Sequence, residues 1–525
     1  MVDHYDAVVV GSGFGGAVVA ARLAEAGRSV CLLERGRRWE PGEFPRSFSQ
    51  TESAVWHEGR SYGFLDYRVF RRMDVVQGSG VGGGSLHYFN VQLRASAQIF
   101  ERPEWPAVFS RPLMDVYYDR VGSVIEARPL EPPAGERMPN RTDAFFAAAT
   151  GAGYQPELVP IAVHTGATRA HPLSGLTQEP CAYTSDCLLG CRPRSKNSLD
   201  VTYLPLGERS GLQVRPLHVA EGIRPTGDGY VVTARRLDPE HPGSWEPAEV
   251  GAAAVVVAAG TLGSNELLLK ARDVHRTLPG LPASLGRRFS TNGDMLFAGT
   301  LEADRPVDPS HGPSITAGAF VQPDGSRHVI HVQDLGYPPA FTSVADSAVP
   351  TGKRLRSTLR AGLGYLRAAR GGPPFRGALL FGGSFVPRFL PYLGMGTDEA
   401  DGVFRLDRRG RLALDWDPSP SMAMFDEMEA AMRGLSRALG GDFMRSPPWR
   451  HPFRRLLTAH PLGGCVLSES PDRGVVDHRG QVWGHPGLFV ADGAVVPGPL
   501  AVNPSLTIAA LGERTAQWML HGREA

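Results

Sequence analysis

The apolar residues near the start of the chain predict a strand, a helix and a second strand. Residues 5–10 contain four consecutive apolar positions, which is typical of a buried parallel strand. Apolar residues then recur at helical spacing over 17–26, and Gly27 follows, where a residue with positive φ is favoured. A second strand, 29–33, leads to Glu34. This order predicts a βαβ unit.

The turn between the first strand and the helix has the spacing G-x-G-x-x-G, with glycine at 11, 13 and 16. These glycines allow backbone N–H groups and the helix N-terminus to approach a pyrophosphate. Glu34 falls 18 residues after Gly16, where an acid binds a ribose hydroxyl. We therefore predict dinucleotide binding, and the alternative is a glycine turn without a ligand.

A second glycine-rich stretch lies at 78–84, where five of seven residues are glycine. Such a stretch is unfavourable in a regular helix or strand. Bulky apolar residues flank it, so we expect it to lie against a large planar or charged ligand rather than to be a flexible linker. The preceding residues, 36–77, are rich in aromatics and arginine. They either cover a pocket or form a surface loop.

Later apolar runs return to the first sheet. Residues 252–259 predict a buried strand that ends at Gly260, near the same nucleotide. Residues 488–494 predict another strand, which ends in Asp-Gly, and a helix begins within 502–511 with Pro504 in its first turn. Residues 212–220 and 230–234 resemble strands of a separate small sheet. The fold class is therefore α/β.

Between residues 293 and 455 strand-like runs alternate with loops, as expected for a substrate-binding part. Within it, 353–367 is a basic stretch with Leu355, Leu359, Leu363 and Leu366 at helical spacing. It could contact a membrane, cover the substrate or be an ordinary surface helix, the reading that we favour.

Composition narrows the class of protein. Of 525 residues, 42% are hydrophobic and 21% charged, as in globular proteins, and two or three substructures are expected at this length. The chain has 55 Lys and Arg residues and 54 Asp and Glu residues, so its net charge gives no reason to expect binding to nucleic acid. The first strand begins too early to leave room for a signal peptide. The sequence contains no run of 18 apolar residues, so we predict no stable membrane insertion. We expect a cytoplasmic protein.

The five cysteines are expected to be reduced thiols. Cys181, Cys187 and Cys191 lie close in the sequence, but three thiols at this spacing do not match four-ligand metal or iron–sulfur patterns. We therefore predict buried or loop thiols and no metal site.

Together these motifs resemble the glucose–methanol–choline (GMC) flavoprotein family, and within it the cholesterol-oxidase branch. The matching segments span nearly the whole chain in family order: 11–16, 80–86, 196–199, 259–263, 292–295, 460–465 and 491–504. The resemblance implies a Rossmann-type FAD-binding domain, formed by 1–90, 181–292 and 456–525. It also implies a substrate-binding domain and lid, formed by 91–180 and 293–455, on a mixed or antiparallel sheet with helices.

The resemblance further implies FAD as the cofactor. The implied cofactor-binding residues are Gly11, Ser12, Gly13, Phe14, Gly15, Gly16, Glu34, Arg35, Gly78, Gly82, Gly83, Gly84, Ser85, His87, Asn90, Val219, Ala259, Gly260, Asp492, Gly493, Asn503 and Pro504. His87 stands where some family members bond a histidine covalently to the flavin, so covalent attachment is a second hypothesis. His460 and Asn503 match the active-site pair of the family.

The implied activity is oxidation of a secondary alcohol on a bulky apolar substrate, sterol-like or polycyclic, by hydride transfer to flavin N5. Electrons would pass to O₂ or another acceptor. Sterol oxidases of this branch also isomerise a double bond with a glutamate, whereas this chain has Gln333 at the nearest match, with Asp334 as a candidate replacement base. Two alternatives remain: a non-redox flavoprotein cyclase or isomerase, and a flavin- or lipid-binding protein without catalysis.

Overall fold

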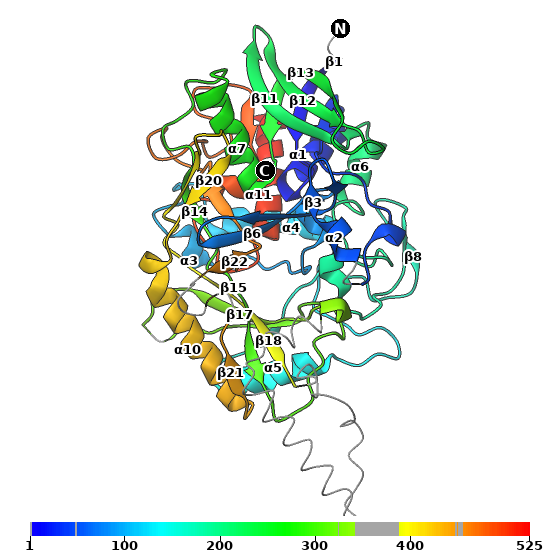
Figure 1. Cartoon of the computed structure of the whole chain (residues 1–525), viewed down its shortest axis with the longest axis vertical. Coiled ribbons are helices and arrows are strands. Elements are labelled where there is room, and N and C mark those ends of the chain that lie inside the picture. Colours follow the sequence, from blue (N-terminus) through cyan, green and yellow to red (C-terminus); the bar gives the residue numbers. More distant parts are fainter. Residues whose placement is uncertain are drawn as a thin grey trace, which may run out of the picture.

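The computed structural model describes residues 3–47, 50–323, 325–341, 388–446, 449 and 455–524. Two large β-sheets organise these residues, one in the upper half of Figure 1 and one in the lower half. Smaller sheets and long loops connect them.

The first large sheet contains the predicted βαβ unit. Its strands are β1 (Asp3–Val10), β2 (Val30–Leu33), β10 (Gln213–Arg215), β11 (His218–Thr226), β12 (Gly229–Leu237), β13 (Trp245–Val257) and β24 (Leu488–Val490). Their order is β10-β2-β1-β13-β12-β11, and β24 pairs with β13. β1 lies between parallel neighbours on both sides, which explains its continuous apolar run.

The prediction of a separate small sheet at 212–234 was wrong. Leu217 has a positive φ of 59°, so the predicted strand over 212–220 is broken by a turn. β10 pairs with β2, whereas β11 pairs with β12 at the opposite edge of the same sheet. The sequence pattern missed this turn because Leu217 is not a typical turn residue.

Two helices of the first domain pack closely together. They are α1 (Phe14–Glu25) and α11 (Ser505–His521). A Cβ added at Gly512 would lie 3.1 Å from the carbonyl oxygen of Gly15, so both helices need small residues at this crossing. The middle of α11 thereby packs against the first turn of α1.

The second large sheet is antiparallel throughout. Its order is β21-β15-β18-β17-β16-β7. The strands are β7 (Glu157–Leu158), β15 (Met295–Leu301), β16 (Ala317–Phe320), β17 (Ile330–Asp334), β18 (Leu390–Gly396) and β21 (Asp442–Met444). Each large sheet draws its strands from one of the two sets of segments predicted as domains, and on this basis we propose the two-domain division.

Helices α5 (Asn140–Gly151) and α10 (Met422–Ala438) cover the second sheet. A Cβ at Gly394 would lie 2.4 Å from the sulfur of Met428, so glycine lets α10 approach β18. Because side chains alternate along a strand, Leu393 faces the opposite side of the sheet.

Shorter elements complete the described chain. The helices are α2 (Thr51–Ala54), α3 (Ala97–Phe100), α4 (Arg111–Ile125), α6 (Tyr203–Arg209) and α7 (Gly260–Leu269). The strands are β3 (Trp56–His57), β4 (Ser61–Tyr62), β5 (Leu65–Val69), β6 (Met73–Gly78), β8 (Arg169–Ala170), β9 (Thr177–Gln178), β14 (Arg287–Ser290), β19 (Gly402–Leu406), β20 (Leu412–Asp415), β22 (Leu456–Thr458) and β23 (Leu462–Gly464). β22 pairs with β6 and β23 with β14, so the segment between them is fixed at both ends.

In the part of the chain that the structure describes, no helix has the length and apolar character needed to cross a membrane. The predicted basic helix at 353–367 lies outside the described residues.

Substitution of Gly15 by alanine tests the packing of α1. The added Cβ would lie 1.6 Å from the carbonyl oxygen of Ala491, so α1 or the end of β24 must move. We expect destabilisation by about 1–3 kcal/mol or more. Thermal unfolding of the purified protein measures it.

Gly122→Ala is the matched control, since its Cβ would have no heavy atom within 4 Å and the residue lies inside α4. We expect this variant to be as stable as the wild type or more stable by up to about 1 kcal/mol. Equal unfolding temperatures for both variants would refute the packing argument.

Candidate active site

A cavity of about 780 Å³ lies between the two large sheets, beyond the carboxyl ends of β1, β13 and β24. Most of the predicted site residues line it: Gly11, Ser12, Gly13, Phe14, Glu34, Arg35, Gly78, Gly83, Gly84, His87, Val219, Ala259, Gly260, His460, Asp492, Gly493, Asn503 and Pro504. The structure therefore brings together residues from both ends of the chain. In parallel sheets this is the usual place for a ligand.

Five predicted residues lie behind the cavity wall: Gly15, Gly16, Gly82, Ser85 and Asn90. A Cβ at Gly16 would lie 2.1 Å from the carbonyl oxygen of Gly11, so this glycine allows the tight turn itself. The hydroxyl of Ser85 donates to the carbonyl of Gly82 and accepts from the N–H of Leu199. These contacts shape the wall and do not face the cavity.

The first glycine turn allows a ligand to approach its backbone closely. Gly11 has a φ of +102°, and a Cβ there would lie 2.2 Å from the carbonyl oxygen of Ala258. A Cβ at Gly13, in contrast, would meet nothing within 4 Å. α1 begins at the next residue, so its unpaired N–H groups lie beside open space, where an anion is favoured.

Glu34 forms part of the cavity wall beside this turn. One carboxylate oxygen accepts hydrogen bonds from the N–H and the hydroxyl of Ser12, at 3.1 and 2.7 Å, and the other accepts from the N–H of Gly36 at 2.9 Å. Burial raises the pKa of Glu34. The carboxyl group is therefore held in place before any ligand binds.

Asp492 follows β24 on the opposite side of the turn. It accepts hydrogen bonds from the N–H of Ala494 and the hydroxyl of Ser264. Burial raises the pKa of Asp492 to about 6. A ligand hydroxyl that donates a hydrogen bond here would favour the charged form.

Two buried polar atoms at the cavity have no hydrogen-bond partner among the described residues: Nε2 of His87 and Oε1 of Gln77. Burial, followed by the charge of Lys196, lowers the pKa of His87 to about 3, so its imidazole is neutral at physiological pH. Such unpaired groups indicate that a polar ligand belongs in the cavity. Covalent attachment at His87 stays a prediction.

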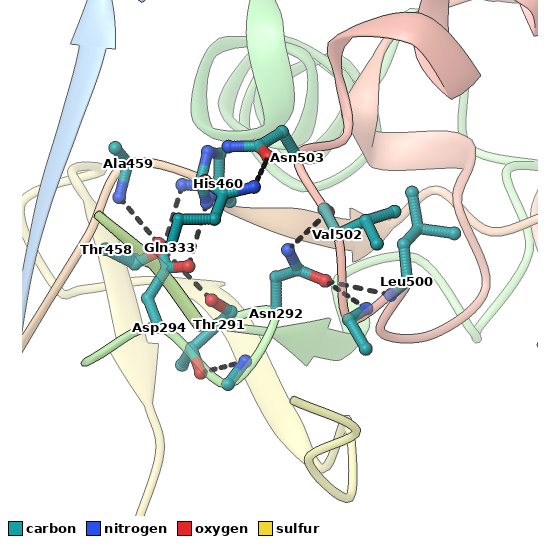
Figure 2. Close-up of polar contacts among 12 residues, drawn as sticks. Thr291, Asn292, Asp294, Gln333, Thr458, Ala459, His460, Leu500, Val502 and Asn503 are labelled. Carbon is teal, nitrogen blue, oxygen red and sulfur yellow. Dashed lines mark hydrogen bonds and ion pairs between the residues drawn. The ribbon is translucent and has the colours of Figure 1, made fainter. Parts of the chain in front are cut away.

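His460 lies between β22 and β23 and lines the cavity. Its Nδ1 lies 2.8 Å from a carboxylate oxygen of Asp294, which is fully buried (Figure 2). The second oxygen of Asp294 accepts from the hydroxyl of Thr458 at 2.8 Å and from the N–H of Ala459 at 3.0 Å. The Nε2 of His460 thus remains for the cavity.

Asn503 stands just before α11 and lines the same cavity. Its side-chain oxygen accepts a hydrogen bond of 2.8 Å from Nε2 of the buried Gln333 on β17 (Figure 2). The amide nitrogen of Asn503 is consequently left to donate elsewhere. Asp334, the next residue on β17, points away from Gln333 because side chains alternate.

Asp334 is not available as a replacement base. Its carboxylate pairs with Arg141 at 3.1 Å and accepts from Thr316 and from the N–H of Ala317, and it does not line the cavity. That hypothesis was wrong because the acid is committed to a buried ion pair.

Sequence reasoning missed the supporting residues of the site. Asn292 donates to the carbonyl of Val502 and accepts from the N–H groups of Leu500 and Ala501, so it fixes the loop before Asn503. Asp294, two residues later, fixes His460. The segment 292–295 was matched as a family motif, but no role was derived for its polar side chains.

The three neighbouring cysteines are free thiols away from the cavity wall. Asn90 donates to the sulfur of Cys187 at 3.1 Å, and the sulfur of Cys191 lies 3.3 Å from the hydroxyl of Ser195. Among the described residues, no three His, Cys, Asp or Glu side chains are placed to hold a metal ion.

Comparison with known proteins identifies the family. A sequence model described as GMC oxidoreductase matches residues 407–512, and one described as an NAD(P)-binding Rossmann-like domain matches 9–44. A cholesterol oxidase from Mycobacterium tuberculosis is 30% identical, over 98% of this chain and 91% of that protein. The chain belongs to the GMC oxidoreductase family.

Other relatives agree with this membership. A cholesterol oxidase from Acinetobacter baumannii is 28% identical over 98% of this chain and 94% of that protein. A solved structure of a fungal aryl-alcohol oxidase has the same fold, with a TM-score of 0.63 over 99% of this chain and 100% of that one, at 17% identity. The GMC protein described here is thus an FAD-dependent alcohol oxidoreductase of the cholesterol-oxidase-like branch.

The cavity fits FAD on structural grounds. Glycines without side chains, the N-terminus of α1 and the unpartnered atoms of His87 and Gln77 supply a surface for a long, partly anionic ligand. We propose that Glu34 and Val219 bind its adenosine end. Asp492 and Gly493 would then bind the ribityl chain. Of the predicted segment Gly82–Ser85, Gly83 and Gly84 line the cavity and would lie along the isoalloxazine and pyrophosphate.

Proposed function

We propose that this GMC oxidoreductase oxidises a secondary hydroxyl group on a bulky apolar substrate, sterol-like or polycyclic, to a ketone. The observation that carries the proposal is an apolar wall on the side of the second sheet. Leu296 and Phe297 of β15 and Leu393 of β18 line the cavity that also contains His460 and Asn503.

Phe297 has an unusual backbone that supports a role at the substrate. Its φ is +61°, which is uncommon for an aromatic residue, and it lies where the register between β15 and β18 shifts. Such bulges often redirect a side chain next to a site. Phe297 is 36% exposed, as expected for a residue at the opening of an apolar cavity.

The proposed chemistry assigns distinct roles to two residues. FAD, when bound, supplies the acceptor of the hydride at N5 of its ring. His460 accepts the hydroxyl proton at Nε2, and Asn503 donates a hydrogen bond to the same oxygen. The apolar wall orients the carbon skeleton and excludes water. The reduced enzyme then returns its electrons to O₂ or another acceptor.

The amide side chain of Gln333 determines which product we expect from a sterol. An amide cannot take up a proton as a glutamate does, and Asp334 is committed to Arg141. We therefore expect a 5-ene-3β-hydroxysteroid to give the unconjugated ketone.

The first test is an anaerobic screen of sterols and polycyclic secondary alcohols. Bleaching of the flavin by at least one of them, with product analysis showing an unshifted double bond, is the expected result. Peroxide formation in air then distinguishes O₂ from another acceptor. A conjugated ketone would contradict the role given to Gln333, and no bleaching by any bulky alcohol would contradict the substrate class.

Replacement of His460 by glutamine tests the proton acceptor. The variant should bind FAD normally, because the hydrogen bonds of His460 go to Thr458 and Asp294, but its flavin reduction should be slower by about 10²- to 10⁴-fold. Rapid anaerobic mixing with the best substrate measures this rate. An unchanged rate would remove the assignment.

Phe297→Ala tests the apolar wall. We expect about a tenfold higher KM for a bulky alcohol, equivalent to roughly 1.4 kcal/mol of lost apolar contact, and little change for a small secondary alcohol. Phe320→Ala is the matched control, since Phe320 is also partly exposed, at 40%, but does not line the cavity. Equal effects of the two substitutions would contradict a direct contact with the substrate.

A further inference from the structure

We infer that Asp294 is a positioning residue that fixes the tautomer of His460 and stabilises its protonated form. The inference concerns the proposed proton acceptor and is independent of which alcohol is oxidised. It starts from the 2.8 Å contact between Nδ1 of His460 and Oδ1 of Asp294. A carboxylate can only accept, so Nδ1 must carry the proton and Nε2 must present a lone pair to the cavity.

The carboxylate itself cannot turn. Its Oδ2 is held by the hydroxyl of Thr458 and the N–H of Ala459. The preceding Gly293 has a φ of +63°, and a Cβ there would lie 2.4 Å from the carbonyl oxygen of Gly396, so the loop is closely packed on β18. Asp294 is therefore rigid relative to the second sheet.

Before the proton is transferred, no cation among the described residues neutralises the charge of Asp294. The side chain is fully buried, and within the described residues its one ion-pair partner is His460. When the substrate hydroxyl loses its proton to Nε2, the imidazole becomes a cation directly beside this carboxylate. The attraction is stronger in a buried site than in water, and it appears only as the reaction proceeds.

The step balances without any further reactant. The O–H bond breaks and its proton moves to Nε2, while the C–H bond breaks and its hydride passes to FAD. The C–O single bond becomes a C=O double bond. The alcohol loses two electrons, which the cofactor of the established activity gains. Asp294 exchanges no proton in this step, because Nδ1 keeps its hydrogen throughout.

Asparagine at position 294 should force the wrong tautomer. The N–H of Ala459 is an obligatory donor, so the asparagine must place its carbonyl oxygen towards Ala459 and Thr458. Its NH₂ group then faces His460, where Nδ1 has to accept. The proton of His460 consequently moves to Nε2, which can no longer accept from the substrate.

The first experiment measures Asp294→Asn in the FAD-loaded protein. We expect kcat and the rate of flavin reduction to fall by about 10²- to 10⁴-fold with KM unchanged. The control is Asp477→Asn, another buried carboxylate, which accepts hydrogen bonds from the N–H groups of Arg479 and Gln481 and does not line the cavity. This control variant should be less stable than the wild type but should keep its kcat and KM. Equal loss of kcat in both variants would overturn the inference.

The second experiment requires neither enzymatic activity nor a variant that turns over substrate. Nitrogen-15 NMR of protein labelled at its histidine rings, with His460→Gln used to identify the signal, reports which nitrogen of His460 carries the proton. We expect protonated Nδ1 and unprotonated Nε2 in the wild type, and the reverse in Asp294→Asn. A proton on Nε2 in the wild type would overturn the inference even if alcohol oxidation itself is confirmed.

Discussion

One short loop, residues 291–294, fixes two segments of the candidate active site relative to each other. Asn292 bonds to three backbone groups of 500–502, and Asp294 bonds to three groups of 458–460. The two segments are far apart in sequence, and neither is fixed by a regular strand at the reacting position. Because the polar groups of this loop are buried and paired, any shift would leave them unsatisfied. The relative placement of His460 and Asn503 therefore depends on this loop.

The loop is in turn fixed by the second sheet. The carboxylate of Asp398 accepts from Ser290 and Thr291, and Gly293 packs against Gly396 at the end of β18. β18 also presents Leu393 to the cavity and its glycines to α10. The same strand thus carries part of the apolar wall and supports the loop behind the polar pair.

The sequence predicted the βαβ unit and the return of two distant strands to the first sheet, but it missed a local turn and the polar contacts between distant segments. The βαβ unit with its glycine turn was predicted correctly because strand, turn and helix signals lie within 30 residues. The small sheet at 212–234 was predicted wrongly, since a leucine with positive φ gives no turn signal. Asp294 was missed for another reason: its partner His460 lies 166 residues further on, and no spacing rule connects them. Burial of a carboxylate beside an imidazole becomes visible only in three dimensions.

The amide at Gln333 is consistent with a site built to donate to oxygen. Because Gln333 donates to the oxygen of Asn503, the NH₂ group of Asn503 is free for the cavity. A glutamate at this position could only accept when ionised, so Asn503 would have to turn its NH₂ group towards it and lose the donor for the substrate. It would also place a second buried negative charge in the region of Asp294, at a cost in desolvation. On the roles proposed for His460 and Asn503, the buried acid and the amide behind them would have separate tasks: the acid would support a positive charge that appears during the reaction, and the amide would direct a neutral donor.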